Sequence, residues 1–320
     1  MTETVVGIDI GGTFTKFGIV TRNGEILAEG SISTDKYDKV EEYQRSLYEA
    51  IDKSIASIKN SINILGIGIG APNANYYKGT IESAANLKWK GIIPFAQMFK
   101  PYFNCPVVLT NDANAAAIGE GIYGGAKGMS DYIVITLGTG VGGGIVSNGN
   151  LIYGHDGFAG EVGHTIAVPN GRECGCGRKG CLETYTSATG IKRTVFELLC
   201  NKNWDSVFRQ VTFNDLTAHN IYEAAQKGDV IAIEAFRLTG LMLGAILADA
   251  VAYTSPEAIF IFGGLAKSGD LLFKPVIESF ENNLLSIFSN KIKILPSGLQ
   301  DKNVAILGAA ALMWKELETK

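Results

Sequence analysis

The chain has 320 residues, which is long enough for two domains with separate hydrophobic cores. Hydrophobic residues make up 46% of the chain and charged residues 19%, a composition typical of soluble globular proteins. The formal net charge of −4 provides no electrostatic basis for binding nucleic acid or an anionic membrane, so neither is expected as a main partner.

The N-terminal residues do not have the pattern of a targeting segment. They lack the basic region of a signal peptide and become glycine-rich by Gly11. The richest apolar run, Leu241–Val251, is interrupted by Asp249 and is shorter than the ~20 residues needed to cross a bilayer. We therefore expect a cytoplasmic protein that does not span a membrane.

The first predicted elements are a strand, a glycine-rich turn and a hairpin. An apolar strand over Val5–Ile10 leads into Gly11-Gly12-Thr13, and strands follow over Lys16–Val20 and Ile26–Ile32. A dinucleotide-binding fold or a P-loop needs a helix directly after its glycine-rich turn. Because a strand follows here, the sequence argues against both.

The rest of the first third alternates between helix and strand. Apolar residues at helical spacing predict an amphipathic helix over Val40–Lys59. Two short strands follow, each ending in small or polar residues. These are Leu65–Ile69, which ends at Gly70-Ala71-Pro72-Asn73, and Val107–Thr110, which ends at Asn111-Asp112 before a helix from Ala113. Residues 1–115 are thus expected to form one mixed α/β domain.

The next segment repeats the pattern of the N-terminus. A strand over Tyr132–Thr136 leads into Gly138-Thr139-Gly140, and a strand returns over Val141–Val146. This similarity predicts a short internal duplication. The remaining predicted elements are helices over Ala188–Leu199 and Ile221–Lys227, a helix capped by Asp229 and reaching about Tyr253, a strand over Ala258–Phe262 that opens onto Gly263-Gly264, a helix over Leu272–Phe288, a strand over Ile292–Leu295 and a helix over Val304–Leu317.

The segment Gly160–Glu183, GEVGHTIAVPNGRECGCGRKGCLE, has the composition of a metal site. Tetrahedral zinc takes about four nitrogen or sulfur ligands, and the segment supplies them as His164, Cys174, Cys176 and Cys181. Four protein ligands leave no position for a reactive water, so the predicted zinc is structural. Glycines between the cysteines are expected to have positive φ or to make room for close approach. A disulfide would leave one of the three cysteines unpaired.

Two carboxylates flank this predicted metal site. Glu161 and Glu183 lie near His164 in the sequence, and carboxylates beside a rigid loop are acceptors for several hydroxyl groups. This arrangement indicates a polyol ligand.

The motifs together resemble those of the ROK family, which comprises repressors, open reading frames and sugar kinases. The resemblance extends over the whole chain, and within the family the sequence is most similar to bacterial glucokinases. The motifs that carry it are Gly7-Ile8-Asp9-Ile10-Gly11-Gly12-Thr13, Asn111-Asp112, Leu137–Gly144, Glu161-Val162-Gly163-His164 and the cysteine segment Cys174–Glu183.

This resemblance implies an actin/hexokinase-like (ribonuclease H-like) α/β fold with two related domains and a cleft between them. The small domain would comprise residues 1–115 and the final segment 303–320, and the large domain residues 116–302 with the zinc loop. The family's repressors carry a DNA-binding helix-turn-helix before the first glycine turn. Here that turn begins at Gly11, so the kinase branch is expected.

The implied activity is ATP- and Mg²⁺-dependent phosphorylation of a hexose at the 6-hydroxyl, with glucose as the first choice. One alternative is a kinase of N-acetylmannosamine or N-acetylglucosamine, because the sequence does not measure the space at C2 of the sugar. Another is a sugar-responsive regulator that lacks catalysis. Dimers are common in the family, so a homodimer is expected.

The resemblance also assigns roles to single residues. Asp112 would be the base that accepts the proton of the hydroxyl, although an Asp in this position is also a candidate N-cap of the following helix. The hexose would contact Gly70, Asn111, Glu161, His164 and Glu183, and His164 would bind zinc through one ring nitrogen and the sugar through the other. The nucleotide would contact Gly11, Gly12, Thr13, Gly138, Thr139, Gly140, Gly263 and Gly264, with Asp9 facing the Mg²⁺.

One position departs from the family pattern. Many relatives have glycine after the proline of the Gly70–Asn73 turn, and this chain has Asn73. Asn tolerates a left-handed backbone, so the turn is expected to persist while its side chain alters one edge of the sugar site.

Overall fold

The computed structural model describes residues 1–59, 61–299 and 303–318. The first half is built on a five-stranded sheet with the order β3-β2-β1-β4-β8, in which β1 to β3 are antiparallel and β1, β4 and β8 are parallel. Its strands are β1 (Thr2–Ile10), β2 (Phe14–Thr21), β3 (Ile26–Ser33), β4 (Ile62–Gly70) and β8 (Val107–Thr110).

A second five-stranded sheet in the other half repeats this order. Two antiparallel pairs, β11-β10 and β10-β9, are followed by the parallel strands β12 and β13. The strands are β9 (Tyr132–Leu137), β10 (Val141–Ser147), β11 (Asn150–Leu151), β12 (Ala258–Gly263) and β13 (Lys293–Pro296). The predicted internal duplication is therefore confirmed, and it extends beyond the two hairpins to both sheets.

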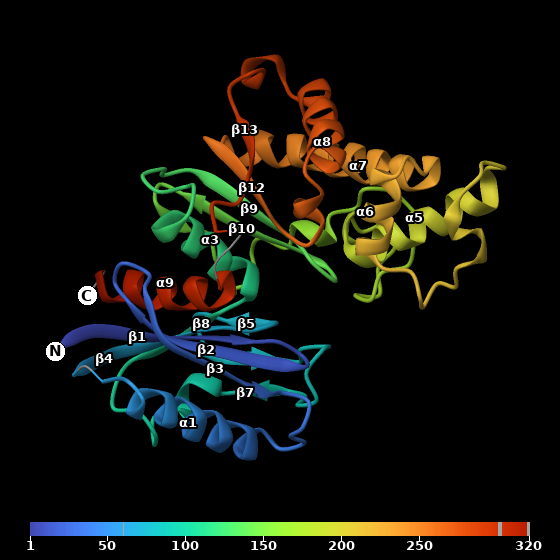
Figure 1. The fold of residues 1–320 in the computed structure, drawn as a ribbon. Coiled ribbons are helices and arrows are strands. Elements are labelled where there is room, and N and C mark those ends of the chain that lie inside the picture. Colours follow the sequence, from blue (N-terminus) through green and yellow to red (C-terminus); the bar gives the residue numbers. More distant parts are fainter. Residues whose placement is uncertain (60, 300–302, 319–320) are drawn as a thin grey trace.

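Helices cover the two sheets and lie between them (Figure 1). Helix α1 (Val40–Ala56) packs on β2 and β3, and α9 (Val304–Glu318) packs on β1 and β4 of the same sheet. Helix α3 (Asp112–Tyr123) contacts both α9 and the strands β9 and β10, so it joins the two halves. The other long helices are α5 (Ala188–Asn201), α6 (Ala218–Gln226), α7 (Val230–Thr254) and α8 (Asp270–Asn283).

Glycines in the first sheet allow α9 to lie directly on its backbone. A Cβ added at Gly7 would lie 2.3 Å from the carbonyl oxygen of Ile306, and one at Gly68 would lie 1.9 Å from that of Ala309. Both distances are below any allowed contact, so a larger side chain would push the helix off the sheet. This close packing supports the proposed assignment of the last helix to the first domain. Residues 300–302, at the end of the predicted large domain, and residues 319–320, at the end of the predicted segment 303–320, lie outside the described residues.

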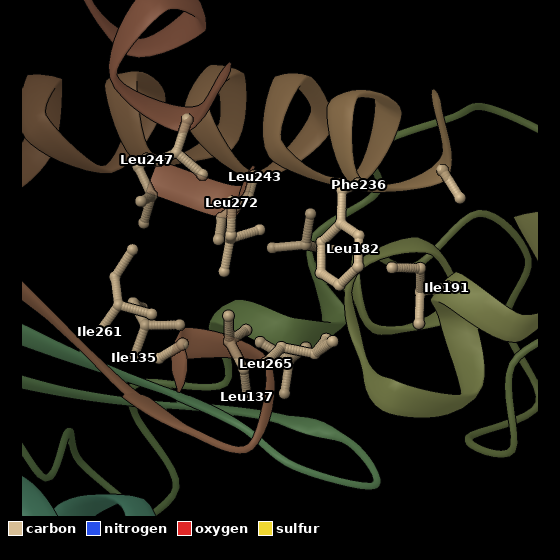
Figure 2. Close-up of a cluster of buried hydrophobic side chains, with 14 of the residues drawn as sticks. Ile135, Leu137, Leu182, Ile191, Phe236, Leu243, Leu247, Ile261, Leu265 and Leu272 are labelled. Carbon is tan, nitrogen blue, oxygen red and sulfur yellow. The ribbon is translucent and has the colours of Figure 1, made fainter. Parts of the chain in front are cut away.

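Helix α7 forms the centre of the second hydrophobic core (Figure 2). Its side chains Leu243 and Leu247 point toward the sheet that carries Ile135 and Ile261, whereas Phe236 lies beside Leu182. All of these side chains are fully buried. Asp229 caps the helix as predicted, because its Oδ1 accepts a hydrogen bond of 3.0 Å from the backbone N–H of Ala232.

The same helix is long and apolar enough, by length and composition alone, to cross a membrane. The apolar run Leu241–Val251, which is too short to span a bilayer, is part of this longer helix, whose extent from Asp229 to about Tyr253 was predicted. About half of its most apolar stretch is buried inside the fold, and α7 packs along α8 and α5. These contacts give the apolar residues a structural role in the core.

Some predicted boundaries were wrong. The helix predicted to reach Phe288 ends at Asn283, whose side chain donates 2.7 Å to the carbonyl oxygen of Ser279, and a separate 3₁₀ turn covers Ser286–Phe288. A small third sheet was not predicted. Its strands β5 (Ala74–Asn75), β6 (Thr80–Glu82) and β7 (Ile92–Ile93) are too short to show a period, as is the helix α2 (Phe95–Met98) that follows.

Candidate active site

Three neighbouring parallel strands bring predicted site residues to one edge of the first sheet. In the strand register Asp9 of β1 lies opposite Gly70 of β4, which lies opposite Thr110 of β8. Asn111 and Asp112 follow Thr110 directly. The carboxyl ends of parallel strands therefore place Asp9, Gly70 and the Asn111-Asp112 pair side by side, at the edge where ligands bind in open α/β sheets.

Asn111, and not Asp112, is the N-cap of α3. The side-chain oxygen of Asn111 accepts a hydrogen bond of 2.7 Å from the backbone N–H of Asn114. Asp112 is the first residue of the helix, and its Oδ1 accepts 2.9 Å from the backbone N–H of Ala113. The N-cap interpretation of Asp112 is thus wrong, and its second carboxyl oxygen is available to a ligand.

Asp112 has the properties of a group in a cleft. The residue is accessible to water, yet desolvation by the surrounding protein raises its pKa. The hydrogen bond from the backbone N–H of Ala113 lowers this pKa by a smaller amount. Desolvation also raises the pKa of Asp9 to about 6, with a further contribution from the charge of Asp112. Two carboxyl groups are therefore held close together, partly removed from water.

Lys16 is a site residue that the sequence analysis did not identify. It lies opposite Asp9 in the β1-β2 register, and its charge opposes the rise in the pKa of Asp9. The sequence could have identified Lys16 from its position in the strand after the first glycine turn, because pairing within the hairpin places this strand position opposite Asp9.

The first glycine turn is closed tightly by the protein's own backbone. The N–H of Gly11 donates 3.0 Å to the carbonyl oxygen of Phe14, and a Cβ on Gly12 would lie 2.7 Å from the carbonyl oxygen of Asn86. Thr13 at its tip is exposed. The glycines are thus required by packing, whether or not a phosphate binds to the turn.

The second glycine turn is open and lies beside Gly263. Gly138 and Thr139 are exposed, and a Cβ on Gly138 would meet no atom within 4 Å. Gly263 pairs with Leu137 and has a φ of 112°, and a Cβ there would lie 2.2 Å from the carbonyl oxygen of Leu137. Only glycine fits this position.

A cavity of about 350 Å³ extends from Gly263 and Gly264 toward the first sheet. Lys16 and Lys267 contribute positive charge to its lining, and the start of α9 closes it. Neither Asp9 nor Asp112 is among the described residues that line it. The predicted nucleotide residues near Gly263 and the predicted hexose residues thus occupy two separate parts of the region between the sheets.

The four predicted zinc ligands converge. The sulfur atoms of the cysteines and a ring nitrogen of His164 all lie within 4.8 Å of one another. The Sγ atoms of Cys176 and Cys181 are 3.7 Å apart, as are Sγ of Cys174 and Nδ1 of His164. Tetrahedral zinc with Zn–S bonds of about 2.3 Å separates its sulfur ligands by about 3.8 Å, whereas a disulfide needs about 2.05 Å. The cluster therefore fits a structural zinc ion, and all five cysteines are free thiols.

The glycines between the cysteines differ in their roles. Gly177 and Gly180 have φ values of 85° and 83°, and a Cβ on Gly180 would lie 1.7 Å from the carbonyl oxygen of Val168. Gly175 has neither a positive φ nor an atom within 4 Å of an added Cβ, so the prediction was wrong for this residue.

His164 connects the cysteine cluster to the carboxylates. Its Nδ1 faces Cys174, while its Nε2 lies 3.9 Å from Oε2 of Glu161. Desolvation raises the pKa of Glu161, His164 lowers it, and the charges of Asp112 and Glu183 raise it further. Asp112, Glu161 and Glu183 are thus close enough to interact electrostatically, although they are far apart in the sequence.

Glu183 is already engaged by the second glycine turn. Its Oε2 accepts 3.0 Å from the backbone N–H of Val141, and its Oε1 accepts 3.7 Å from the thiol of Cys174. A Cβ on Gly140 would lie 2.2 Å from the same Oε2. Glu183 therefore links the cysteine segment to the strand after Gly140. Sequence spacing did not predict this link.

Asn73 has the predicted left-handed backbone, with a φ of 51°. Its side-chain amide donates 3.1 Å to the carbonyl oxygen of Glu82, and the backbone N–H of Glu82 donates 3.0 Å back to Asn73. The turn thus persists without glycine.

A larger cavity of about 920 Å³ lies away from these residues, between the 3₁₀ turn Val207–Gln210 and α6. The carboxylate of Asp229 at its rim is already bound to the backbone N–H groups of Val207 and Ala232. None of the predicted catalytic, sugar-binding, nucleotide-binding or zinc residues lines this cavity, so the candidate site remains between the two sheets.

Known proteins resemble this chain in sequence and in fold. A family model described as ROK family matches residues 5–316. The glucokinase of Halalkalibacterium halodurans is 38% identical over 280 residues, which cover 86% of this chain and 84% of that protein. A xylose repressor of Caldicellulosiruptor bescii is 30% identical over 317 residues, which cover 98% of this chain and 79% of the repressor.

The structural similarity is equally extensive. The crystal structure of a ROK family glucokinase from Streptomyces griseus in complex with glucose and AMPPNP has a TM-score of 0.79 and 32% sequence identity, covering 97% of this chain and 98% of that one. The expected actin/hexokinase-like fold is thereby confirmed. With a family model that spans nearly the whole sequence and relatives of 30–38% identity, this chain belongs to the ROK family.

Proposed function

We propose that this protein is an ATP-dependent hexose kinase that phosphorylates the 6-hydroxyl group, with glucose as the preferred substrate. The observation that carries the proposal is the position of Asp112, a water-accessible carboxyl group within electrostatic range of Asp9 and Glu161. The relatives support the same reaction, since one is a glucokinase and another was crystallised with glucose and AMPPNP, an analogue of ATP.

In the proposed reaction Asp112 is the general base. The oxygen of the hexose 6-hydroxyl forms a bond to the γ-phosphorus of ATP while Asp112 accepts the hydroxyl proton. The bond from this phosphorus to the β–γ bridging oxygen breaks, and ADP leaves with the electron pair. The raised pKa of Asp112 makes its carboxylate a stronger base than an ordinary aspartate.

The hexose is proposed to lie among the hydroxyl-binding groups around Asp112. Glu161 and Glu183 accept hydrogen bonds from hydroxyl groups, and Nε2 of His164 faces the same side as Glu161. Asn111 and the backbone at Gly70 complete the sugar site at the edge of the first sheet. Since Glu183 already accepts a backbone hydrogen bond, its free lone pairs are the ones offered to the sugar.

The nucleotide is proposed to bind along the two glycine turns and the cavity at Gly263-Gly264. Backbone N–H groups of Gly11–Thr13 and Gly138–Gly140 are suited to phosphate oxygens, and Lys16 supplies a cation at the cavity. Bound Mg²⁺ would neutralise charge on the β- and γ-phosphates, with Asp9 as the residue facing its hydration shell.

The zinc ion is proposed to be structural. Held by His164 and the three cysteines, it stiffens the loop on which Glu161 and Glu183 lie, without entering the chemical step. We further propose a cytoplasmic homodimer, supported by the family resemblance and the soluble composition of the chain.

Two other functions are distinguished by experiment. An N-acetylhexosamine kinase would use the same residues with a wider pocket at C2 of the sugar. A sugar-responsive regulator is favoured by the xylose repressor that matches 98% of this chain. The accessible carboxylate of Asp112 favours catalysis over regulation alone.

The test measures ADP release from Mg-ATP with glucose, N-acetylmannosamine, N-acetylglucosamine, fructose or no sugar. Asp112→Asn is expected to lower kcat by about 10²–10⁴-fold while glucose binding changes little, because general-base catalysis contributes about that much. In the wild type, kcat/KM should fall on the acid side at a pH above the usual range of an aspartate, since the base must be ionised and its pKa is raised.

Asp270→Asn, a carboxylate on α8 that pairs with Lys274, is the matched control and should retain full activity. Turnover highest with an N-acetylhexosamine would move the proposal to that substrate. No turnover with any sugar, from folded and zinc-loaded protein, would contradict a hexose kinase and favour the regulator.

A further inference from the structure

The loop that precedes Glu161 is attached to the first half of the molecule by contacts that the proposed chemistry does not use. The loop covers residues 152–160, after β11 of the second sheet. It meets the hairpin of β5 and β6, residues 74–82, which extends from the strand carrying Gly70. Asn75 of the hairpin and Tyr153 of the loop both make contacts between these segments.

Asn75 is fully buried, and both ends of its side chain are hydrogen-bonded. Its amide Nδ2 donates 2.7 Å to the carbonyl oxygen of Asp156 in the loop, while its Oδ1 accepts 3.2 Å from the backbone N–H of Lys78 in the hairpin. Gly157 has a φ of 91°, and a Cβ there would lie 2.9 Å from Oδ1 of Asn75. The loop backbone thus lies directly on this side chain, and only glycine allows the approach.

Tyr153 attaches the start of the loop to the same half. Its ring stacks on Tyr76 of the hairpin, with centroids 4.1 Å apart and planes 6° from parallel. The hydroxyl of Tyr76 in turn donates 2.6 Å to Glu316 of α9. The hydroxyl of Tyr153 faces the side chain of Thr110, the residue that precedes Asn111-Asp112.

The loop is closed on itself between these two attachments. Ala159 lies two residues before Glu161, and its backbone N–H donates a hydrogen bond of 3.0 Å to the carbonyl oxygen of Tyr153. At its far end Gly160 rests on β10, since a Cβ there would lie 2.8 Å from the carbonyl oxygen of Gly143. The position of Glu161 is therefore set from both halves of the molecule, through Asn75 and Tyr153 on one side and β10 on the other.

We propose that Asn75 and Tyr153 are positioning residues of the hexose site, which hold the loop before Glu161 at a fixed place relative to Asp112. This inference rests on the proposed hexose kinase function. Asp112 follows a strand of the first sheet and Glu161 follows strands of the second, and the proposed hexose contacts both carboxylates at once. A displacement of about 1 Å between groups that bind one substrate can lower a rate by about 10²-fold. Asn75 and Tyr153 can therefore affect the binding and phosphorylation of the sugar without contacting it.

The test compares Asn75→Ala and Tyr153→Leu with the wild type. Both are expected to raise the KM for the preferred hexose by about tenfold while the KM for ATP stays within about twofold, because only the sugar side loses its alignment. Tyr153→Phe keeps the ring stacking and should recover most of the hexose affinity. Tyr102→Leu is the matched control, since it removes one ring of another stacked tyrosine pair, Tyr48 and Tyr102, and should leave both KM values unchanged.

Hydrogen–deuterium exchange provides a measurement that does not depend on activity. The segment 152–162 should exchange faster in Asn75→Ala and Tyr153→Leu, with no change in the cysteine segment 172–183. An unchanged exchange rate in segment 152–162 of both variants would overturn the proposal even if the protein phosphorylated no sugar. Faster exchange with a lower Tm but an unchanged hexose KM in an active enzyme would assign the two residues to stability alone and would also overturn it.

A wild type that turns over no hexose would instead contradict the proposed kinase function. In that case direct binding of glucose, measured by calorimetry, replaces KM in the comparison of the variants. Equal glucose affinity in Asn75→Ala and the wild type would then reject the positioning role.

Discussion

At the scale of single residues, the ionised forms of Asp9 and Asp112 destabilise each other. Asp9 lies partly buried beside Asp112, and desolvation together with this neighbour raises its pKa from 3.8 to about 6. The folded protein therefore binds a proton at Asp9 more tightly than the unfolded chain does, whereas the proposed chemistry uses the ionised form with Mg²⁺. Lys16 offsets part of this cost from the adjacent strand.

The raised pKa of Asp9 predicts that Asp9→Asn stabilises the protein near neutral pH. The stability from protonated Asp9 is fully present below about pH 3.8 and is lost as the pH rises through about 6. A neutral amide avoids this loss, so the variant should be more stable at pH 7 by about 1–3 kcal/mol, and the difference should disappear below about pH 4. Thermal melts over this pH range, without nucleotide, measure it.

The same substitution should abolish most of the activity, because the carboxylate proposed to face Mg²⁺ is gone. A lower Tm than the wild type at pH 7 would contradict the electrostatic account. It would show instead that the carboxyl group of Asp9 makes a stabilising interaction that the amide cannot replace.

At the scale of elements, the cysteine segment has two independent supports. The four ligand atoms converge on one point, and Arg172 separately ties the segment to α5. The guanidinium of Arg172 pairs with Glu197 at 2.6 Å, donates 2.7 Å to the carbonyl oxygen of Thr184 and lies 4.4 Å from the ring of Tyr185. With one support removed, the other still connects the segment to the second core.

We therefore expect Cys176→Ser to lose zinc without unfolding the protein. Metal analysis should find about one zinc per wild-type chain and much less in the variant, since four ligands close a structural site. The Tm should fall and the KM for the hexose should rise, while kcat at saturating sugar should change far less, because the zinc loop holds the sugar and not the base.

Cys200→Ser is the matched control, because Cys200 is another exposed thiol and lies outside the cluster. It should retain its zinc and its hexose KM. A zinc-free Cys176→Ser protein with unchanged affinity for the hexose would separate the metal from sugar binding.

At the scale of the whole molecule, the two halves share one strand order and are joined through α3 and α9. Helix α3 begins at Asp112, and Glu120 lies in its last turn. The buried carboxylate of Glu120 accepts a hydrogen bond of 2.7 Å from the backbone N–H of Gly298 and another from the hydroxyl of Ser297, both after β13. The helix that carries the proposed base is thus anchored to both sheets.

The proposed homodimer predicts a solution mass of twice the 34.2 kDa chain. Light scattering coupled to gel filtration should give this mass over a wide range of protein concentration, because symmetric two-fold assemblies are the commonest oligomers. Substrate-free and glucose-bound samples serve as internal controls. A mass of one chain in both would reject the dimer without affecting the proposed reaction.

Much of this protein was determined by local sequence. Strands ending in glycine or polar residues, the Asp229 cap and the four zinc ligands were predicted because each depends on residues a few positions apart. The repeat of the first hairpin predicted a short internal duplication, and the structure extended it to the strand order of both sheets. The roles of the site residues stay predictions.

Other features were decided only by the tertiary structure, because they join residues distant in the sequence. Lys16 reaches Asp9 through hairpin pairing, and Glu183 reaches Val141 through the fold of the zinc loop. Asn75 and Asp156 are 81 positions apart, and no sequence pattern in either segment indicates their contact. Desolvation, which raises the pKa of Asp112, likewise depends on how the surrounding segments pack, and no single stretch of sequence specifies it.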